Sequence, residues 1–143
     1  MPLQSQIVVD ADHRQKCQLL IQALRTYRCV SLRVTGTSMW PAIWPGDTVE
    51  IRAAQFQGIE AGALVAFTRN DRIFVHRVVR EADSSATFIT RGDALPHDDP
   101  PVRASEFLGV ASVTAKVPRT LLRRLRQTLH YRLLPTVRDR IRS

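Results

Sequence analysis

Ser38 stands in a segment whose residue types suit an exposed nucleophile. It follows Gly36 at the end of a predicted strand and precedes Pro41, so we expect the backbone to turn sharply there. Such a turn presents the serine hydroxyl and the serine amide together, as a nucleophile with an oxyanion-binding N–H requires. A single serine in this setting is more often an ordinary turn residue, so the prediction depends on partners elsewhere in the chain.

His76 and a group of aspartates are the candidate partners. His76 lies in a predicted strand, and Asp93, Asp98 and Asp99 lie in a loop rich in glycine and proline. A neutral imidazole can take a serine proton near pH 7, and a carboxylate can fix its tautomer and stabilise the imidazolium. Each of these residues alone is typical of an ordinary strand histidine or a solvated turn. The residues by themselves leave open whether Asp98 or Asp99 would orient the histidine.

The three segments together support the prediction more strongly than each one alone, because they follow one another in the order of a known signature. The matching residues are Gly36, Ser38, Met39 and Pro41; Gly46 and Asp47; His76, Arg77 and Val78; Thr90, Arg91 (in place of a lysine), Gly92 and Asp93; and Asp99. On these residues the chain resembles the serine peptidases of the signal peptidase I and self-cleaving repressor superfamily, in particular the histidine-base branch of archaea and the endoplasmic reticulum. The resemblance extends over residues 31–113.

This resemblance implies a serine peptidase in which Ser38 is the nucleophile, His76 the general base and Asp99 the carboxylate that orients the histidine. Asp93 would be a supporting carboxylate, and the six-residue offset between Asp93 and Asp99 matches the signature. The Ser38 amide, helped by Thr37, would bind the oxyanion, because a glycine replaces the serine that many signal peptidases have two positions earlier. The implied substrate is an extended, leader- or signal-like peptide with small residues before the scissile bond. No cofactor and no metal are implied.

Three apolar residues next to the serine, Met39, Trp40 and Trp44, are the candidate substrate contacts. The two tryptophans are the only ones in the chain. Two interpretations of them stay open: they pack in the core beside neighbouring prolines, or they form an apolar surface around the groove that binds an extended peptide or touches lipid.

One helix and a series of short strands must position these residues. Apolar residues at helical spacing predict an amphipathic helix from Asp12, its N-cap, to Tyr27, and alternation at Val30, Leu32 and Val34 predicts the first strand. The apolar face of the helix consists of Cys17, Leu20, Ile21, Leu24 and Tyr27; the other strands are expected at Asp47–Arg52, Ala63–Thr68, Ile73–Arg80, Ala86–Arg91 and Phe107–Val113. Short strands without intervening helices indicate a mainly β fold, a small antiparallel barrel or sandwich. We therefore divide the chain into an N-terminal helix (1–29), a signal peptidase-like β domain (30–117) and a basic helical tail (118–143).

The charge of the chain is concentrated in that tail. Of the formal net charge of +8, residues 119–143 carry most, with eight arginines and one acid. Leucines on one face of the predicted tail helix lie opposite arginines on the other. Three interpretations stay open: a solvated helix packed on the domain, a helix bound to an anionic membrane surface, and a nucleic-acid-binding segment, which is least favoured because no recognition motif accompanies the charge.

No signal peptide and no membrane span are expected, since no apolar run approaches the roughly 20 residues of a span. We therefore expect the protein in the cytoplasm or peripherally on a membrane, although the signal peptidases that it resembles usually carry a span before the serine segment. Two other functions stay open. One is an intracellular protease that processes itself or a soluble precursor, and the other is a non-catalytic module that holds a peptide or a membrane surface on the same scaffold.

Overall fold

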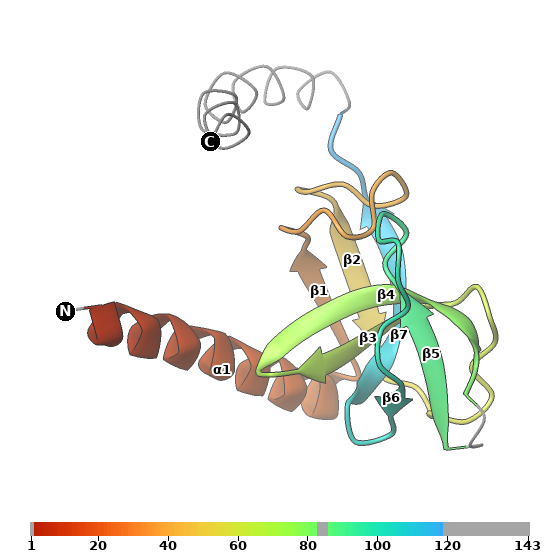
Figure 1. The fold of residues 1–143 in the computed structure, drawn as a ribbon, viewed down its shortest axis with the longest axis horizontal. Coiled ribbons are helices and arrows are strands. Elements are labelled where there is room, and N and C mark those ends of the chain that lie inside the picture. Colours follow the sequence, from red (N-terminus) through yellow and green to blue (C-terminus); the bar gives the residue numbers. More distant parts are fainter. Residues whose placement is uncertain (1, 83–85, 119–143) are drawn as a thin grey trace, which may run out of the picture.

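A single antiparallel sheet forms most of the molecule. The computed structural model describes residues 2–82 and 86–118. In this part the chain forms α1 (Pro2–Tyr27), β1 (Cys29–Arg33), β2 (Thr48–Arg52), β3 (Leu64–Arg69), β4 (Arg72–Glu81), β5 (Thr87–Arg91), β6 (Val102–Arg103) and β7 (Phe107–Ala115). The strands lie in the order β1-β2-β7-β3-β4-β5-β6, and the sheet twists strongly between its two ends (Figure 1). The predicted mainly β, antiparallel fold is confirmed.

The sheet does not close into a barrel within the described residues. The pairings run from β1 at one edge to β6 at the other, and β6 contributes only two residues to its pairing with β5. Such a short edge strand offers little backbone for a further partner. The sequence predicts a barrel or a sandwich, whereas the described residues form one continuous, strongly twisted sheet with a helix against it.

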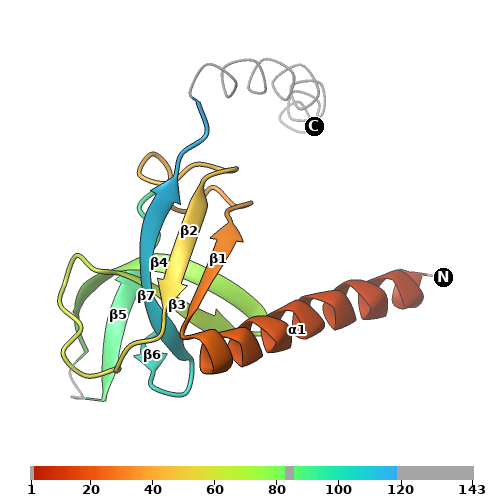
Figure 2. The ribbon, with the colours of Figure 1, turned by 180° about the vertical axis from the view of Figure 1, so that it is seen from behind.

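Helix α1 covers part of this sheet with its C-terminal half. Leu20 and Leu24 are buried against Ile51 and Ala66 of the sheet, and Cys17 is buried one turn earlier. This spacing of three and four residues is the apolar stripe that the sequence predicts. The N-terminal half of the helix extends beyond the sheet (Figure 2).

Two details of the predicted helix need correction. The helix begins at Pro2, and Asp12 lies inside it and is not its N-cap. Proline is favoured at the first helical position because its missing N–H has no partner there, and no glycine or proline interrupts the chain from Pro2 to Asp12. Tyr27, expected on the apolar face, is 75% exposed, because the helix ends there and Arg28 turns away with a φ of 64°.

The predicted strands are found within two residues of their expected ends, and β6 is the strand that the sequence does not predict. Two residues are too few to show the alternation of apolar and polar residues that predicts a strand. The turn between β3 and β4 consists of Asn70 and Asp71, both with positive φ (52° and 57°), as in a two-residue hairpin. This tight turn fixes the register of β3 and β4, in which Val65 lies opposite His76.

A core cluster beneath the turn that follows β1 holds that turn against the sheet. Met39, Ile43 and Val49 are buried together, and Leu64 and Val75 of the sheet pack against them. The residues on both sides of Ser38 are thereby anchored.

No helix in the described part of the chain is long and apolar enough to cross a membrane. The predicted basic helical tail, residues 119–143, lies outside the described residues.

Candidate active site

Ser38, His76 and Asp99 come from three distant parts of the sequence and meet in one chain of contacts. Ser38 lies in the turn after β1, His76 in the middle of β4 and Asp99 in the loop between β5 and β6. Ser38 Oγ lies 3.1 Å from His76 Nε2, and His76 Nδ1 lies 2.6 Å from Asp99 Oδ2. An ionised carboxylate only accepts hydrogen bonds, so the Nδ1 nitrogen carries the hydrogen and donates it to Asp99. In the neutral imidazole, Nε2 then keeps its lone pair toward the serine hydroxyl, as a general base must.

The two neighbouring aspartates of the loop face different partners. Asp98 accepts a hydrogen bond from Arg80 at 2.9 Å and lies 3.7 Å from a guanidinium nitrogen of Arg91. Asp99 is tied back to the sheet by its amide, which donates to the Thr90 carbonyl at 2.8 Å. The structure therefore brings Asp99, and not Asp98, to His76.

A buried threonine and two aromatic rings surround the histidine–aspartate pair. The Thr90 hydroxyl donates to Asp99 Oδ2 at 2.7 Å, so this oxygen accepts from both the threonine and the imidazole. His76 is only 3% exposed, and the rings of Phe67 and Phe74 stand edge-on to it at centroid distances of 5.9 and 5.8 Å. Packing and hydrogen bonding together leave the imidazole one orientation, toward Ser38.

The loop after β5 supports the serine from the other side. The Ala94 amide donates to the Ser38 carbonyl at 2.9 Å. At Gly92 the backbone comes so close to Ser38 that a Cβ added there would lie 2.6 Å from the same carbonyl oxygen. Gly92 is therefore required by close backbone approach, which explains the glycine of this sequence segment.

Asp93 acts on this loop and not on the histidine. Arg77 donates two hydrogen bonds to its carboxylate, at 2.9 and 2.8 Å, and a third to the Gly62 carbonyl at 3.0 Å. The hydrogen bonds to Asp93 raise the pKa of Arg77 above its usual value. The Asp93 amide also lies 3.4 Å from the Met39 sulfur. Asp93 thus fixes the loop that touches Ser38.

The turn itself is stabilised by local hydrogen bonds. The Trp40 amide donates to the Thr37 carbonyl at 3.1 Å, and the Ile43 amide donates to the Met39 carbonyl at 2.9 Å. No backbone acceptor is found for the Ser38 amide among residues 2–82 and 86–118. This amide is the N–H that the sequence predicts for an oxyanion hole. Thr37 is exposed at the start of the turn, and no hydrogen bond of its hydroxyl to Ser38 is found in that same part of the chain.

The three predicted substrate contacts lie in different surroundings. Met39 is 3% exposed and packs in the core, so its side chain anchors the turn and does not line a groove; this corrects the prediction. Trp44 is half-buried, and its ring nitrogen donates to the Pro41 carbonyl at 2.9 Å. Trp40 stands edge-on to Trp44 at 5.6 Å and is 38% exposed, so it presents apolar surface next to the serine.

Asp47 fixes the far end of this turn. It is 1% exposed, and its carboxylate accepts from the Trp44 amide at 2.9 Å and from the Val117 amide at 2.8 Å. The chain leaving β7 is thereby tied to the loop that carries the tryptophans.

Sequence reasoning assigned no role to Thr90 or Phe74, although both lie next to the candidate residues. Thr90 belongs to the matched signature, and this match is the sequence feature that could have pointed to a role for Thr90. Phe74 stands two residues before His76 and hence on the same face of β4. Within the described residues, no group of three or more histidines, cysteines or acids has the arrangement to hold a metal ion.

The fold and these contacts define the class: an antiparallel β protein that carries a serine, a histidine and an aspartate in sequential contact. Residues 4–110 match the family model described as Peptidase S24-like. This match covers more than half of the chain, so the chain belongs to the Peptidase S24-like family. No curated protein gives a significant match. Family membership supports the superfamily that the sequence resembles and indicates a peptidase-type function.

Proposed function

We propose that this protein is a serine endopeptidase that cleaves an extended peptide through an acyl-enzyme intermediate. The observation that carries this proposal is the continuous set of contacts from Ser38 Oγ to His76 Nε2 at 3.1 Å and from His76 Nδ1 to Asp99 at 2.6 Å. Membership in a peptidase family supports it independently.

Each residue then has one task. His76 Nε2 takes the hydroxyl proton as Ser38 Oγ attacks the peptide carbonyl, and Asp99 stabilises the imidazolium that forms. The Ser38 amide donates to the oxyanion of the tetrahedral intermediate. When the C–N bond breaks, His76 gives the proton to the leaving amine. A water molecule, deprotonated by the same histidine, hydrolyses the acyl ester and restores the serine.

This proposal places the protein with the histidine-base members of the superfamily. An imidazole accepts a proton near pH 7 without the strong desolvation that a lysine base requires. No cofactor or metal takes part.

The substrate that we propose is a leader- or signal-like segment with small residues before the scissile bond. This specificity comes from the resemblance, and the exposed face of Trp40 beside Ser38 offers apolar surface for such a segment. We propose a cytoplasmic or peripheral membrane location, with the basic tail as the contact to an anionic surface. The related alternative, processing of the chain itself or of a soluble precursor, is tested by incubating the purified protein and looking for a self-generated fragment.

A fluorophosphonate probe tests the nucleophile without knowledge of the substrate. The wild-type protein should be labelled at Ser38, and both Ser38→Ala and His76→Ala should abolish labelling and peptide cleavage while the circular dichroism spectrum stays unchanged. Ser112→Ala, at an exposed serine of β7, is the matched control and should be labelled like the wild type. Cleavage that persists in Ser38→Ala overturns the assignment. A folded wild-type protein that is never labelled instead favours a non-catalytic binding module.

A further inference from the structure

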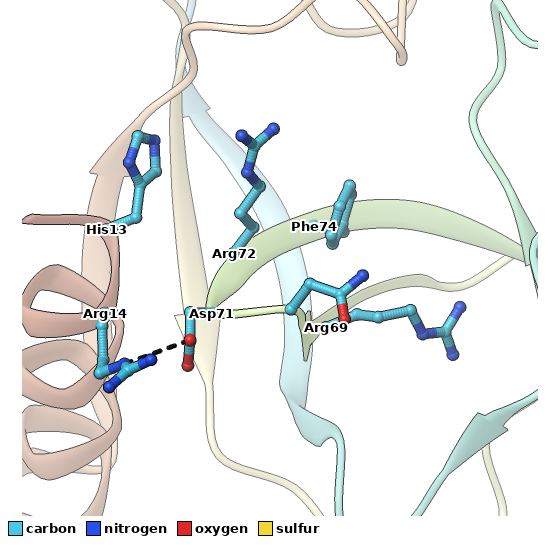
Figure 3. Close-up of a pocket in the computed structure, with 7 residues that line it drawn as sticks. His13, Arg14, Arg69, Asp71, Arg72 and Phe74 are labelled. Carbon is cyan, nitrogen blue, oxygen red and sulfur yellow. Dashed lines mark hydrogen bonds and ion pairs between the residues drawn. The ribbon is translucent and has the colours of Figure 1, made fainter. Parts of the chain in front are cut away.

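A pocket of about 590 Å³ lies between α1 and the β3–β4 hairpin. Its lining residues are His13, Arg14, Arg69, Asn70, Asp71, Arg72 and Phe74 (Figure 3). This volume is typical of a site that takes a side chain or a small molecule. Of these residues only Phe74 also contacts the candidate active site, through its ring beside His76.

The lining of the pocket carries an excess of positive charge. Its three arginines face a single acid, Asp71. Arg14 pairs with Asp71 at 3.3 Å. Arg69 also has partners. It donates two hydrogen bonds to the Glu106 carboxylate, at 3.2 and 2.9 Å, and others to the carbonyls of Pro100 and Pro101.

Arg72 is the lining arginine whose charge is not balanced by a carboxylate of the described residues. It is exposed, and in the part of the chain that the structure describes no carboxylate pairs with it. In the view of Figure 3 its guanidinium lies between His13 and Phe74 and points away from the Arg14–Asp71 pair. A guanidinium in this position is suited to a carboxylate or phosphate oxygen.

Two features define the walls of the pocket. The two-residue turn of Asn70 and Asp71 fixes the hairpin, and the Arg14–Asp71 pair ties the hairpin to α1. The Asp71 carboxylate also makes the pocket better suited to a singly charged carboxylate than to a doubly charged phosphate.

The pocket is adjacent to the catalytic centre that we propose. Phe74 lines the pocket, and its ring stands 5.8 Å from the His76 ring. Arg72 precedes His76 by four positions on β4, which at about 3.3 Å per residue is roughly 13 Å. An extended peptide covers that distance in about four residues.

We propose that this pocket is a subsite for an acidic side chain of the peptide substrate, located about four or more residues from the scissile bond. The carboxylate is bound by Arg72, with His13 and Phe74 beside it. This inference rests on the proposed peptidase function for its effect on cleavage, but not for the binding itself.

Binding is tested on the Ser38→Ala protein with acetylated tetraglutamate amide, followed by NMR at the His13 ring and the Arg72 side chain. Tetraglutamine and inorganic phosphate are the comparison probes. We expect tetraglutamate to shift both signals and to bind about tenfold more weakly to Arg72→Gln, since a guanidinium–carboxylate hydrogen bond is lost. Arg25→Gln, which removes the same charge from an exposed position of α1 outside the pocket, should bind like the parent protein.

Three outcomes of this experiment overturn the subsite: no shift with tetraglutamate, equal binding by Arg72→Gln, or phosphate binding that exceeds tetraglutamate binding. Digestion of a peptide library by the wild-type protein gives the second readout. Cleaved peptides should be enriched in Asp and Glu about four or more residues from the cut, and Arg72→Gln should lose this enrichment while it still cleaves. If no peptide is cleaved but tetraglutamate binds through Arg72, the peptidase proposal fails and the anionic subsite stands.

Discussion

The Thr90 hydroxyl offers a sharp test of how the candidate site is organised. Thr90 is completely buried, and its hydroxyl donates at 2.7 Å to the Asp99 oxygen that also accepts from His76. Thr90→Val keeps the shape of the side chain and removes this donor. Asp99 then loses one of the two hydrogen bonds that fix its orientation and stabilise its negative charge. If the proposed mechanism holds, Thr90 is a positioning residue that acts on the histidine through the aspartate.

The size of the effect follows from the strength of a hydrogen bond to a charged acceptor, about 1.5–3 kcal/mol. Each 1.36 kcal/mol changes a rate by tenfold, so Thr90→Val should slow acylation by about 10- to 150-fold if the whole bond is felt in the transition state. The matched variant Thr90→Ser keeps the hydroxyl and loses one methyl group, at a cost of about 1 kcal/mol in stability.

The assay is the second-order rate of fluorophosphonate labelling of Ser38, measured from pH 5 to 9 on proteins whose thermal unfolding is recorded in parallel. We expect Thr90→Ser to label nearly as fast as the wild type and Thr90→Val to label slowly, with a displaced pH profile. Equal rates and equal pH profiles for the two variants, both folded, would refute the reasoning. A merely structural role would leave the pH profiles of both variants unchanged.

Two other predictions concern the glycine beside Ser38 and the Arg69–Glu106 ion pair. Gly92→Ala places a methyl group 2.6 Å from the Ser38 carbonyl, and such overpacking costs about 1–3 kcal/mol; a lower unfolding temperature together with slower labelling is expected, and wild-type behaviour in both would contradict the close approach. Hydrogen bonds from Arg69 lower the pKa of Glu106 below its ordinary 4.5, so this carboxylate stabilises the fold above about pH 4.5 and the stabilisation is lost as pH falls through the lower pKa of the folded protein. Urea unfolding of wild type and Glu106→Gln should therefore differ at pH 7 and converge in strong acid, and a constant difference would show that the ion pair is not the cause.

Much of the fold follows from local patterns in the sequence. The strands were predictable because alternating apolar residues and turn residues act within a few positions of each other. The start of α1 and the two-residue β6 were not, because a helix start inside a sequence compatible with helix gives no signal and a two-residue strand has no period. Barrel closure was not predictable either, since it depends on the pairing of the two sheet edges.

The candidate site, too, was predictable only in part. The turn around Ser38, the strand histidine and the acidic loop are local, and their order along the chain matches a family signature. Whether Met39 points to solvent or to the core depends on the surface beneath the turn, and the structure buries it against Leu64 and Val75.

The sequence by itself determined which residue types are present for the proposed peptide hydrolysis and, approximately, in which elements they lie. The six-residue offset from Asp93 favoured Asp99 only through the family resemblance, whereas the contact of Asp99 with His76 is shown by the tertiary structure. Asp98 and Asp99 are neighbours with the same chemistry, but the Asp99 amide is bonded to the Thr90 carbonyl, so the backbone there is aligned with β5 and the two side chains diverge. Asp99 then meets His76, whereas Asp98 meets Arg80. That contact depends on how the loop after β5 folds back on the sheet, which the chemistry of two neighbouring aspartates does not show.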